Sequence, residues 1–427
     1  MNTNMKVYNL LFLMLFAFIY SVDGQVKYFT SVNSKLIKNL QVKVSGQKIS
    51  NSYITLGSSD KIEINFDGLG YGYTGYTYSI IHCNGDWTKS SLTTIEYLDG
   101  FQGLNIEDFA NSIGTTALYS NYRLFLPNKD VQFKVSGNYA VQVYKETDPS
   151  NIIFTACFSV VEPKVGIVAS IDGNTDIDTH QNHQQVNFNI NTRNFSVAYP
   201  QTDLKIFVYQ NNRHDNFVTD LQPLSIQGND ISYYHNRNLI FPAGNEYRRM
   251  EFLSSKYNGM HVEHISFHRP YYNVELTTDQ KRSNATYEYD QDQNGRFFSR
   301  CSRCSDPDTE GDYYIVHFAL ESNELPEGDV YLNGEFLNNE LNDISRMSYN
   351  QQTKRYEKSI LLKQGSYNYQ YLFVPSGSST GETAPIEGNY YQTENEYSIY
   401  VYYCPMGARY DRLIGVTSVK NEMPSIN

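Results

Sequence analysis

The chain has 427 residues and a formal net charge of −12, with 34 Lys and Arg against 46 Asp and Glu. An acidic chain without a run of Lys or Arg lacks the counterion release that drives nucleic-acid binding, and it is poorly suited to an anionic lipid surface. We therefore expect protein or neutral-sugar partners and no nucleic acid. Since the sequence has no apolar run long enough to span a bilayer and no complete metal or cofactor motif, we also expect no direct membrane insertion and no cofactor, metal or small-molecule ligand.

Composition and periodicity predict an all-β protein. Aromatic residues make up 15% of the chain, mainly Tyr and Phe, which favour pleated, half-buried surfaces. Apolar and polar residues alternate throughout, whereas runs at helical spacing are few. Turn signals separate strand-like stretches about every 8–12 residues, the spacing typical of β-sandwiches. The length suits about three such domains.

Residues 1–24 have the features of a secretory signal peptide. Lys6 precedes an apolar run at 10–20 that is too short to span a bilayer, and Val22 and Gly24 are acceptable to a signal peptidase. We predict cleavage near Gly24 and a mature protein that is soluble outside the cytosol.

We predict the first β-sandwich domain over residues 25–163. The strand predicted at 152–163 carries four apolar residues on one face, and Pro163 then ends it. These four residues are Phe154, Ala156, Phe158 and Val160.

Trp87, the only tryptophan, follows Asn84-Gly85, the preferred pair for a two-residue hairpin turn. We favour a structural role for Trp87 at the end of the sandwich over an aromatic platform for a sugar or a partner protein. Cys83 and Cys157 flank it in the immunoglobulin order, but Cys83 is too close to Trp87 for that geometry, so we assign no disulfide to them.

The second sandwich is predicted over 164–276, followed by a polar linker at 277–312 with at most two short strands. The third is predicted over 313–427, where Asn333-Gly334 is a hairpin signal and the stretch 394–404 is expected to supply the closing strand. Tyr367, Tyr369, Tyr371 and Phe373 share one face of a strand in this block.

The clearest candidate for chemistry is the pair Cys301 and Cys304. A redox CxxC needs a helix after its first thiol, and a zinc site needs four ligands; neither is available here, so we expect a local disulfide or two free thiols.

Three further clusters resemble metal sites only in part. The stretch Asp290-x-Asp292-x-Asn294-Gly295 begins like a calcium loop but has Cys301 at the twelfth position. The carboxylates of 171–178 are expected to be a solvated loop; they are Asp172, Asp176 and Asp178. On a strand, His264 and His268 share a face that His261 does not. Common nucleophile and phosphate-binding motifs are absent from the sequence, so we predict no catalytic residues.

Eight stretches in the same order resemble the plug protein family of the type IX secretion system. They are 81–101, 122–128, 136–144, 208–216, 241–252, 361–373, 387–403 and 409–415. The resemblance implies three consecutive immunoglobulin-like or early-set-like sandwiches without catalysis. It also implies a periplasmic protein that binds the periplasmic opening of the outer-membrane translocon barrel and closes it while no cargo is exported. The Cys301/Cys304 pair is not a feature that we associate with this family.

The third block also resembles the early-set sandwiches of glycogen-binding modules. The positions that carry this resemblance are Gly365, Tyr367, Tyr369, Tyr371 and Val374. Those modules stack sugars on tryptophan, and this block has none, so the resemblance implies the fold without the ligand. The tyrosine-lined strand still suggests an alternative function, a periplasmic or cell-surface carbohydrate-binding accessory protein. A glycosidase is a third option without a motif to support it.

Overall fold

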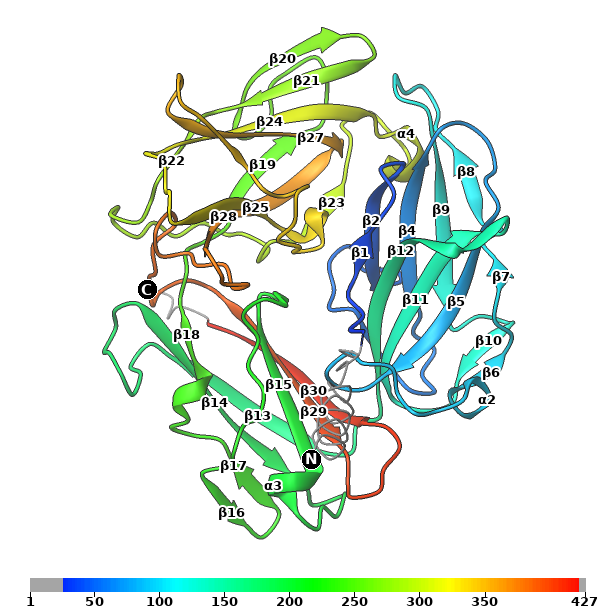
Figure 1. The fold of residues 1–427 in the computed structure, drawn as a ribbon, viewed down its shortest axis with the longest axis vertical. Helices are drawn as coiled ribbons and strands as arrows, with labels where there is room; N and C mark the ends of the chain where they lie inside the picture. Colours follow the sequence, from blue (N-terminus) through cyan, green and yellow to red (C-terminus); the bar gives the residue numbers. More distant parts are fainter. Residues whose placement is uncertain (1–25, 422–427) are drawn as a thin grey trace, which may run out of the picture.

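A computed structural model describes residues 26–421, and the chain in this range consists mostly of β-strands in several antiparallel sheets (Figure 1). The predicted signal peptide lies outside the described residues. The α-helices within the range are single turns of four residues each: α2 (Thr94–Tyr97), α3 (Pro200–Asp203) and α4 (Pro307–Glu310). Between residues 26 and 421, no helix has the length and apolarity needed to cross a membrane. The predicted all-β class is confirmed.

The first sheet pair packs two sheets face to face around one core. One sheet has the order β1 (Ser31–Val32), β12 (Asp148–Val161), β11 (Gly137–Lys145), β5 (Tyr76–Cys83) and β7 (Leu104–Asn105), with β3 (Tyr53–Thr55) parallel to β12. The other has the order β2 (Ile37–Val44), β4 (Ile62–Leu69), β9 (Tyr119–Leu126) and β8 (Phe109–Asn111). A small ribbon of β6 (Leu98–Gly100) and β10 (Val131–Phe133) covers one end.

The alternation predicted for 152–163 is confirmed, because Phe154, Ala156, Phe158 and Val160 of β12 are all buried in this core. They share this core with Ile64 and Phe66 of β4, and the centres of the Phe66 and Phe154 rings lie 4.7 Å apart.

The second sheet pair combines residues from two distant parts of the chain. One sheet has the order β13 (Gly166–Asp172), β14 (His183–Asn191), β17 (Asp230–Ser232) and β16 (Ser225–Gln227), with β18 (Ile240–Pro242) also on β14 and the 3₁₀ turn η1 (Arg237–Leu239) before it. The other has the order β15 (Leu204–Gln210), β29 (Glu396–Tyr403) and β30 (Arg412–Lys420).

The third sheet pair lies between these two parts in sequence. One sheet has the order β19 (Arg248–Phe252), β28 (Gly365–Pro375) and β23 (Phe297–Ser299), with β25 (Gly328–Asn333) also on β28 and the 3₁₀ turn η2 (Glu335–Leu337) after it. The other has the order β20 (Val262–His268), β21 (Tyr271–Leu276), β24 (Tyr313–Glu321), β27 (Arg355–Lys363) and β26 (Ser348–Asn350), with β22 (Asp279–Gln280) parallel to β24.

The stretch 394–404 forms a strand as predicted, but its predicted place as the closing strand of the third block is wrong. It forms β29, which pairs along its length with β15 of the second sheet pair, so the red strands β29 and β30 lie beside green β15 in Figure 1. Tyr397, Ile399 and Val401 of β29 are buried in the second core. The third sheet pair is thus inserted within the second, and the three units are not consecutive.

The strand pairing also crosses the expected boundary at residue 276. β19 pairs with β28, and β21 lies parallel to β24, although β19 and β21 were expected in the second block. The expected linker at 277–312 contains two short strands, β22 and β23, and both belong to sheets of the third pair. In Figure 1 the three sheet pairs occupy the corners of a triangle.

Two predicted hairpin turns differ from expectation. The turn after β5 runs from Asn84 to Trp87, whose N–H donates to the Asn84 carbonyl, so Gly85 and Asp86 occupy its centre. Trp87 itself takes the left-handed conformation with φ 67°. Gly334 leads into η2, and β25 pairs with β28, because the chain crosses to another strand here.

Candidate functional site

A buried ion pair joins the first and third sheet pairs. Lys363, the last residue of β27, places its Nζ 2.8 Å from the Asp67 carboxylate on β4, and both side chains are fully buried. Tyr313 Oη and Asn121 Nδ2 also donate to Asp67, at 2.5 and 2.9 Å. The Lys363 ammonium lies 4.2 Å from the centre of the Tyr119 ring. Burial raises the pKa of Asp67, while the lysine and the hydrogen bonds oppose the rise.

The segment that we name the latch, residues 301–312, surrounds this ion pair and contacts both sheet pairs. On the side of the first pair, Asn65 Nδ2 donates to Asp308 at 2.9 Å and Tyr119 Oη donates to the Gly311 carbonyl at 2.6 Å. Asp312 accepts from the backbone N–H groups of Thr116 and Ala117 at 2.9 and 3.1 Å.

The latch also forms hydrogen bonds to the third sheet pair. Lys363 Nζ donates to the Asp308 carbonyl at 2.6 Å, and Asp312 exchanges two hydrogen bonds with Gln364. Within the latch, Asp306 caps α4 by accepting from Asp308 N–H at 3.0 Å. A segment expected to be a linker is therefore hydrogen-bonded to two sheet pairs.

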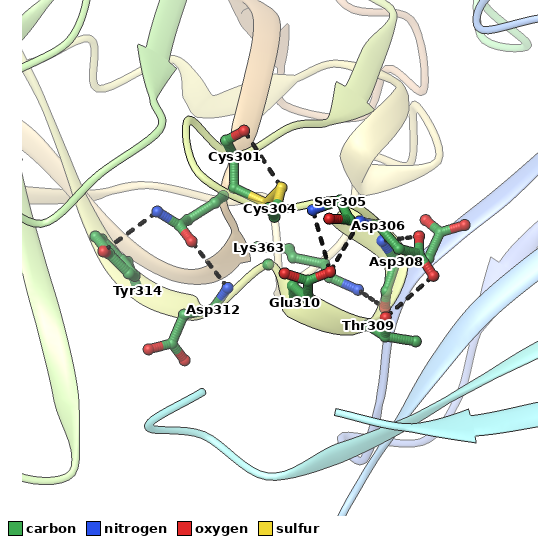
Figure 2. Close-up of a disulfide and its surroundings, with 12 residues drawn as sticks. Cys301, Cys304, Ser305, Asp306, Asp308, Thr309, Glu310, Asp312, Tyr314 and Lys363 are labelled. Atoms are coloured by element: carbon green, nitrogen blue, oxygen red, sulfur yellow. Dashed lines mark hydrogen bonds between the residues drawn. A yellow bond between two sulfur atoms is a disulfide. The ribbon is translucent and has the colours of Figure 1, made fainter. Parts of the chain in front are cut away.

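The sulfurs of Cys301 and Cys304 are bonded to each other at the start of the latch. Figure 2 shows this disulfide directly before α4, with Lys363 reaching the segment from the other side. Both cysteines are half-buried, and Ser302 and Arg303 between them are exposed. The bond closes the turn that carries the chain from β23 into α4.

The corner at residues 84–88 joins the first and second sheet pairs. Gly85 N–H donates to Asp411 at 3.0 Å, and Asp411 forms an ion pair of 2.9 Å with Lys205 of β15. A Cβ at Gly85 would lie 2.8 Å from the Phe207 ring, so only glycine allows this approach. Trp87 is 9% exposed, and its ring meets His214 edge to face at 6.5 Å. The expected structural role for Trp87 extends to a contact between sheet pairs.

A third contact brings all three sheet pairs together. Arg296, just before β23, donates to Asn51 of the first pair at 2.6 Å and to Glu396 of β29 at 2.7 Å. Asn51 Nδ2 also donates to Glu396, at 3.0 Å. Burial would raise the pKa of Glu396, but the Arg296 charge together with the hydrogen bonds from Arg296 and Asn51 outweighs burial and lowers the pKa. A cavity of about 120 Å³ is also lined by residues of all three pairs, including Trp87, Tyr209 and Glu335.

The carboxylates of the two calcium-like loops have protein partners. Asp290 accepts from Arg249 at 2.8 Å, and Asp292 accepts from the backbone N–H groups of Tyr247 and Asn294. Burial raises the pKa of Asp292 to about 7. In the other loop, Asp176 and Asp178 pair with His235 and His183 at 3.0 and 2.7 Å, and Asp172 accepts from Asn174 N–H at 2.7 Å. No group of three metal-ligating side chains occurs in the part of the chain that the structure describes.

The three histidines do not converge. His261 precedes β20 and lies 3.2 Å from Asp279, whereas His264 and His268 are exposed on β20 itself. Cys83 and Cys157 lie on β5 and β12 with β11 between them, and both are free thiols, as is Cys404.

The tyrosines predicted on one face of β28 point into the third core. Tyr367, Tyr369 and Tyr371 are at most 1% exposed, and the last two donate to Asp279 at 2.9 and 2.7 Å. They have no free face on which a sugar could stack. Neither Asp67 nor Lys363 could be recognised from the sequence as a site residue, since an isolated charge carries no motif.

Residues 37–162 match the family model described as "Type 9 secretion system plug protein 1st domain". The fold is similar to the crystal structure of a hypothetical protein from Parabacteroides merdae ATCC 43184, with 74% sequence identity and a TM-score of 0.92. That match covers 93% of this chain and 100% of the other. No protein with a curated description matches the chain.

Proposed function

Since the chain belongs, through the first domain at residues 37–162, to the type 9 secretion system plug family, we propose that it is a periplasmic plug. In this role it binds the periplasmic opening of the outer-membrane translocon barrel and seals it while no cargo is exported. Membership of a plug family implies a non-catalytic role. The observation that carries the proposal is the family match, and the signal-like residues 1–24 agree with the periplasm.

The contacts between the sheet pairs support this role, because a plug must keep one shape to close an opening. Asp67 with Lys363, Gly85 with Asp411, and Arg296 with Glu396 each link different sheet pairs through buried or nearly buried groups. Breaking such contacts exposes a buried charge or an unpaired donor, which is costly. The three units therefore resist moving relative to one another.

Co-purification tests the binding. The chain is tagged at its C-terminus, expressed in cells that have a type IX secretion system, and purified from gently solubilised envelopes. We expect a large outer-membrane barrel among the proteins that mass spectrometry identifies. A periplasmic protein of similar size with the same tag is the control, and a preparation without the barrel would contradict the proposal.

Outer-membrane permeability tests the sealing separately. Cells that lack the protein should take up a large, normally excluded antibiotic faster than wild-type cells, and re-expression should restore exclusion. Deleting the barrel as well should abolish the difference, since the leak requires the open pore. An unchanged uptake in cells that lack the protein, with binding intact, would argue for a different role at the barrel.

A further inference from the structure

A cavity of about 280 Å³ lies between the first and third sheet pairs, next to the latch. One wall comes from the β1–β2 turn and β2, and the other from β23, β27 and the chain around η2. Apart from the buried Lys363, the buried parts of both walls are mainly apolar, with Ile37 and Leu40 on one side and Phe297, Leu337 and Leu362 on the other. Exposed residues also line the cavity, Lys35 on one side and Ile344 on the other, so it opens to solvent.

The charged residues of the lining are mainly basic. Lys35, Lys38 and Lys363 line the cavity, and Glu340 is the single carboxylate in its described lining. Burial raises the pKa of Glu340 to about 7, so that carboxyl is only partly ionised near neutral pH. Lys363 is engaged with Asp67, but within residues 26–421 no carboxylate oxygen lies within 4.0 Å of Lys35 or Lys38.

Lys38 is half-buried without a counter-charge. Its register partner on β4 is Asp67, whose carboxylate is occupied by Lys363, Tyr313 and Asn121. Burial lowers the pKa of Lys38. A partly desolvated ammonium at the edge of an apolar cavity favours an anion beside it.

The side-chain amide of the neighbouring Asn39 is a second, independent group that lacks a hydrogen-bond acceptor. Its Oδ1 accepts from Gln41 and Ser299 at 3.3 and 3.2 Å, while its buried Nδ2 has no acceptor among the described residues. Buried donors in folded proteins nearly always have a partner. Residues 35–39 thus present two ammonium groups and an amide N–H beside one apolar cavity.

We propose that this cavity binds a single-chain amphiphile with an anionic head. The head, a carboxylate or a phosphate, accepts from Lys35, Lys38 and Asn39, and the alkyl chain lies between the apolar walls. The volume is close to the lower end of the range of about 300–1,000 Å³ for small-molecule sites, which suits one short chain. A cationic head would be repelled by the lysines, and a neutral head would leave their charges unpaired. This ligand class was not among the partners expected from sequence, and the proposal does not depend on the plug function.

Calorimetric titration of the purified mature chain with sodium decanoate tests the proposal. We expect one saturable site, and Lys38→Gln should weaken binding about tenfold or more, as the loss of a charged hydrogen bond does. Lys129→Gln is the matched control, because Lys129 is exposed on a loop with 88% of its side chain accessible. Decyl phosphate in a parallel titration distinguishes a phosphate from a carboxylate preference.

Decyltrimethylammonium and decyl glucoside carry the same chain and test the head. Both should bind much more weakly than decanoate. Equal binding of all three, no saturable binding of either anion, or the same affinity in Lys38→Gln as in wild type would each overturn the proposal. Thermal unfolding of each variant separates a lost ligand contact from a misfolded protein. Lys35→Gln is a second variant of the binding residues, at an exposed position where misfolding is not expected.

Discussion

Asp67 and Lys363 are 296 residues apart in sequence, yet their charged atoms lie 2.8 Å apart in an interior where both side chains have no solvent exposure. One belongs to the first sheet pair and the other to the third. The latch closes around them, so the most deeply buried ion pair within residues 26–421 lies in the contact between two units. The stability of each unit therefore depends on its contact with the other.

Lys363→Met should lower the free energy of unfolding by about 3–5 kcal/mol, because it leaves the Asp67 carboxylate buried without a counter-charge. Adding Asp67→Asn should restore a large part of this loss, since the uncompensated charge disappears. Urea unfolding of the two single variants and the double variant measures the coupling. A loss below about 1 kcal/mol in Lys363→Met would show that the pair is not the buried charge contact described here.

The disulfide predicts a specific pattern of thiol reactivity. Three of the five cysteines are free, namely Cys83, Cys157 and Cys404. Alkylation of the unfolded, unreduced protein should therefore modify these three, and peptide mapping should recover Cys301 linked to Cys304. Two alkylated thiols at 301 and 304 in protein trapped at once would contradict the bond.

Removing the bond should have a modest cost. Loop-closure entropy for so short a ring is about 2 kcal/mol, so Cys301→Ser with Cys304→Ser should reduce the unfolding free energy by at most about that much. Hydrogen exchange should rise mainly in the latch and in the facing residues 112–118. Cys404→Ser, which removes a free thiol, is the control and should leave exchange in both segments unchanged.

The local parts of the fold were predictable, and the distant pairings were not. The alternation in 152–163 decides which side chains face a core, and Cys301 and Cys304 are close enough in sequence that their pairing needs no distant contact. The stretch 394–404 was correctly read as a strand, but Tyr397 and Ile399 would suit the apolar face of any sheet. Their alternation does not specify β15 as the partner strand. Proximity in sequence instead favoured pairing within the third block, which is wrong.

Most of the candidate site could not be predicted from the sequence, for the same reason. Lys363, Arg296 and Asp411 acquire their roles from partners more than 90 residues away, which one sequence does not reveal. Gly85 is expected from the sequence to permit a turn and does lie at the centre of one, but its close approach to Phe207 could not be predicted. Trp87 takes the strained left-handed position in its place.

Gly85→Ala should loosen the contact between the first and second sheet pairs. The added Cβ would lie 2.8 Å from Phe207 and 3.1 Å from Tyr402, both buried rings that cannot turn away easily. Overpacking of this kind costs about 1–3 kcal/mol, measured by urea unfolding. Gly75→Ala is the matched control, because its Cβ would meet nothing closer than 3.6 Å. Equal stability of the two variants would mean that the corner is not tightly packed.

His82 should make the protein less stable as the pH falls below about 6.5. Its ring is 1% exposed, with Nε2 3.2 Å from the Ser136 carbonyl and Nδ1 2.8 Å from Ser90 Oγ, an arrangement for neutral imidazole. Burial lowers its pKa from 6.5 to about 4.

The unfolded chain then binds more protons than the folded one between these two values, so the stabilisation is complete above 6.5 and is lost as the pH falls towards 4. From pH 7 to pH 5 the contribution of His82 to the free energy of unfolding should fall by about 2 kcal/mol. Urea unfolding at both pH values measures the total change, and His82→Gln should reduce that change by this amount even if the variant is less stable at pH 7. The same pH dependence in wild type and variant would show that His82 titrates normally in the folded protein.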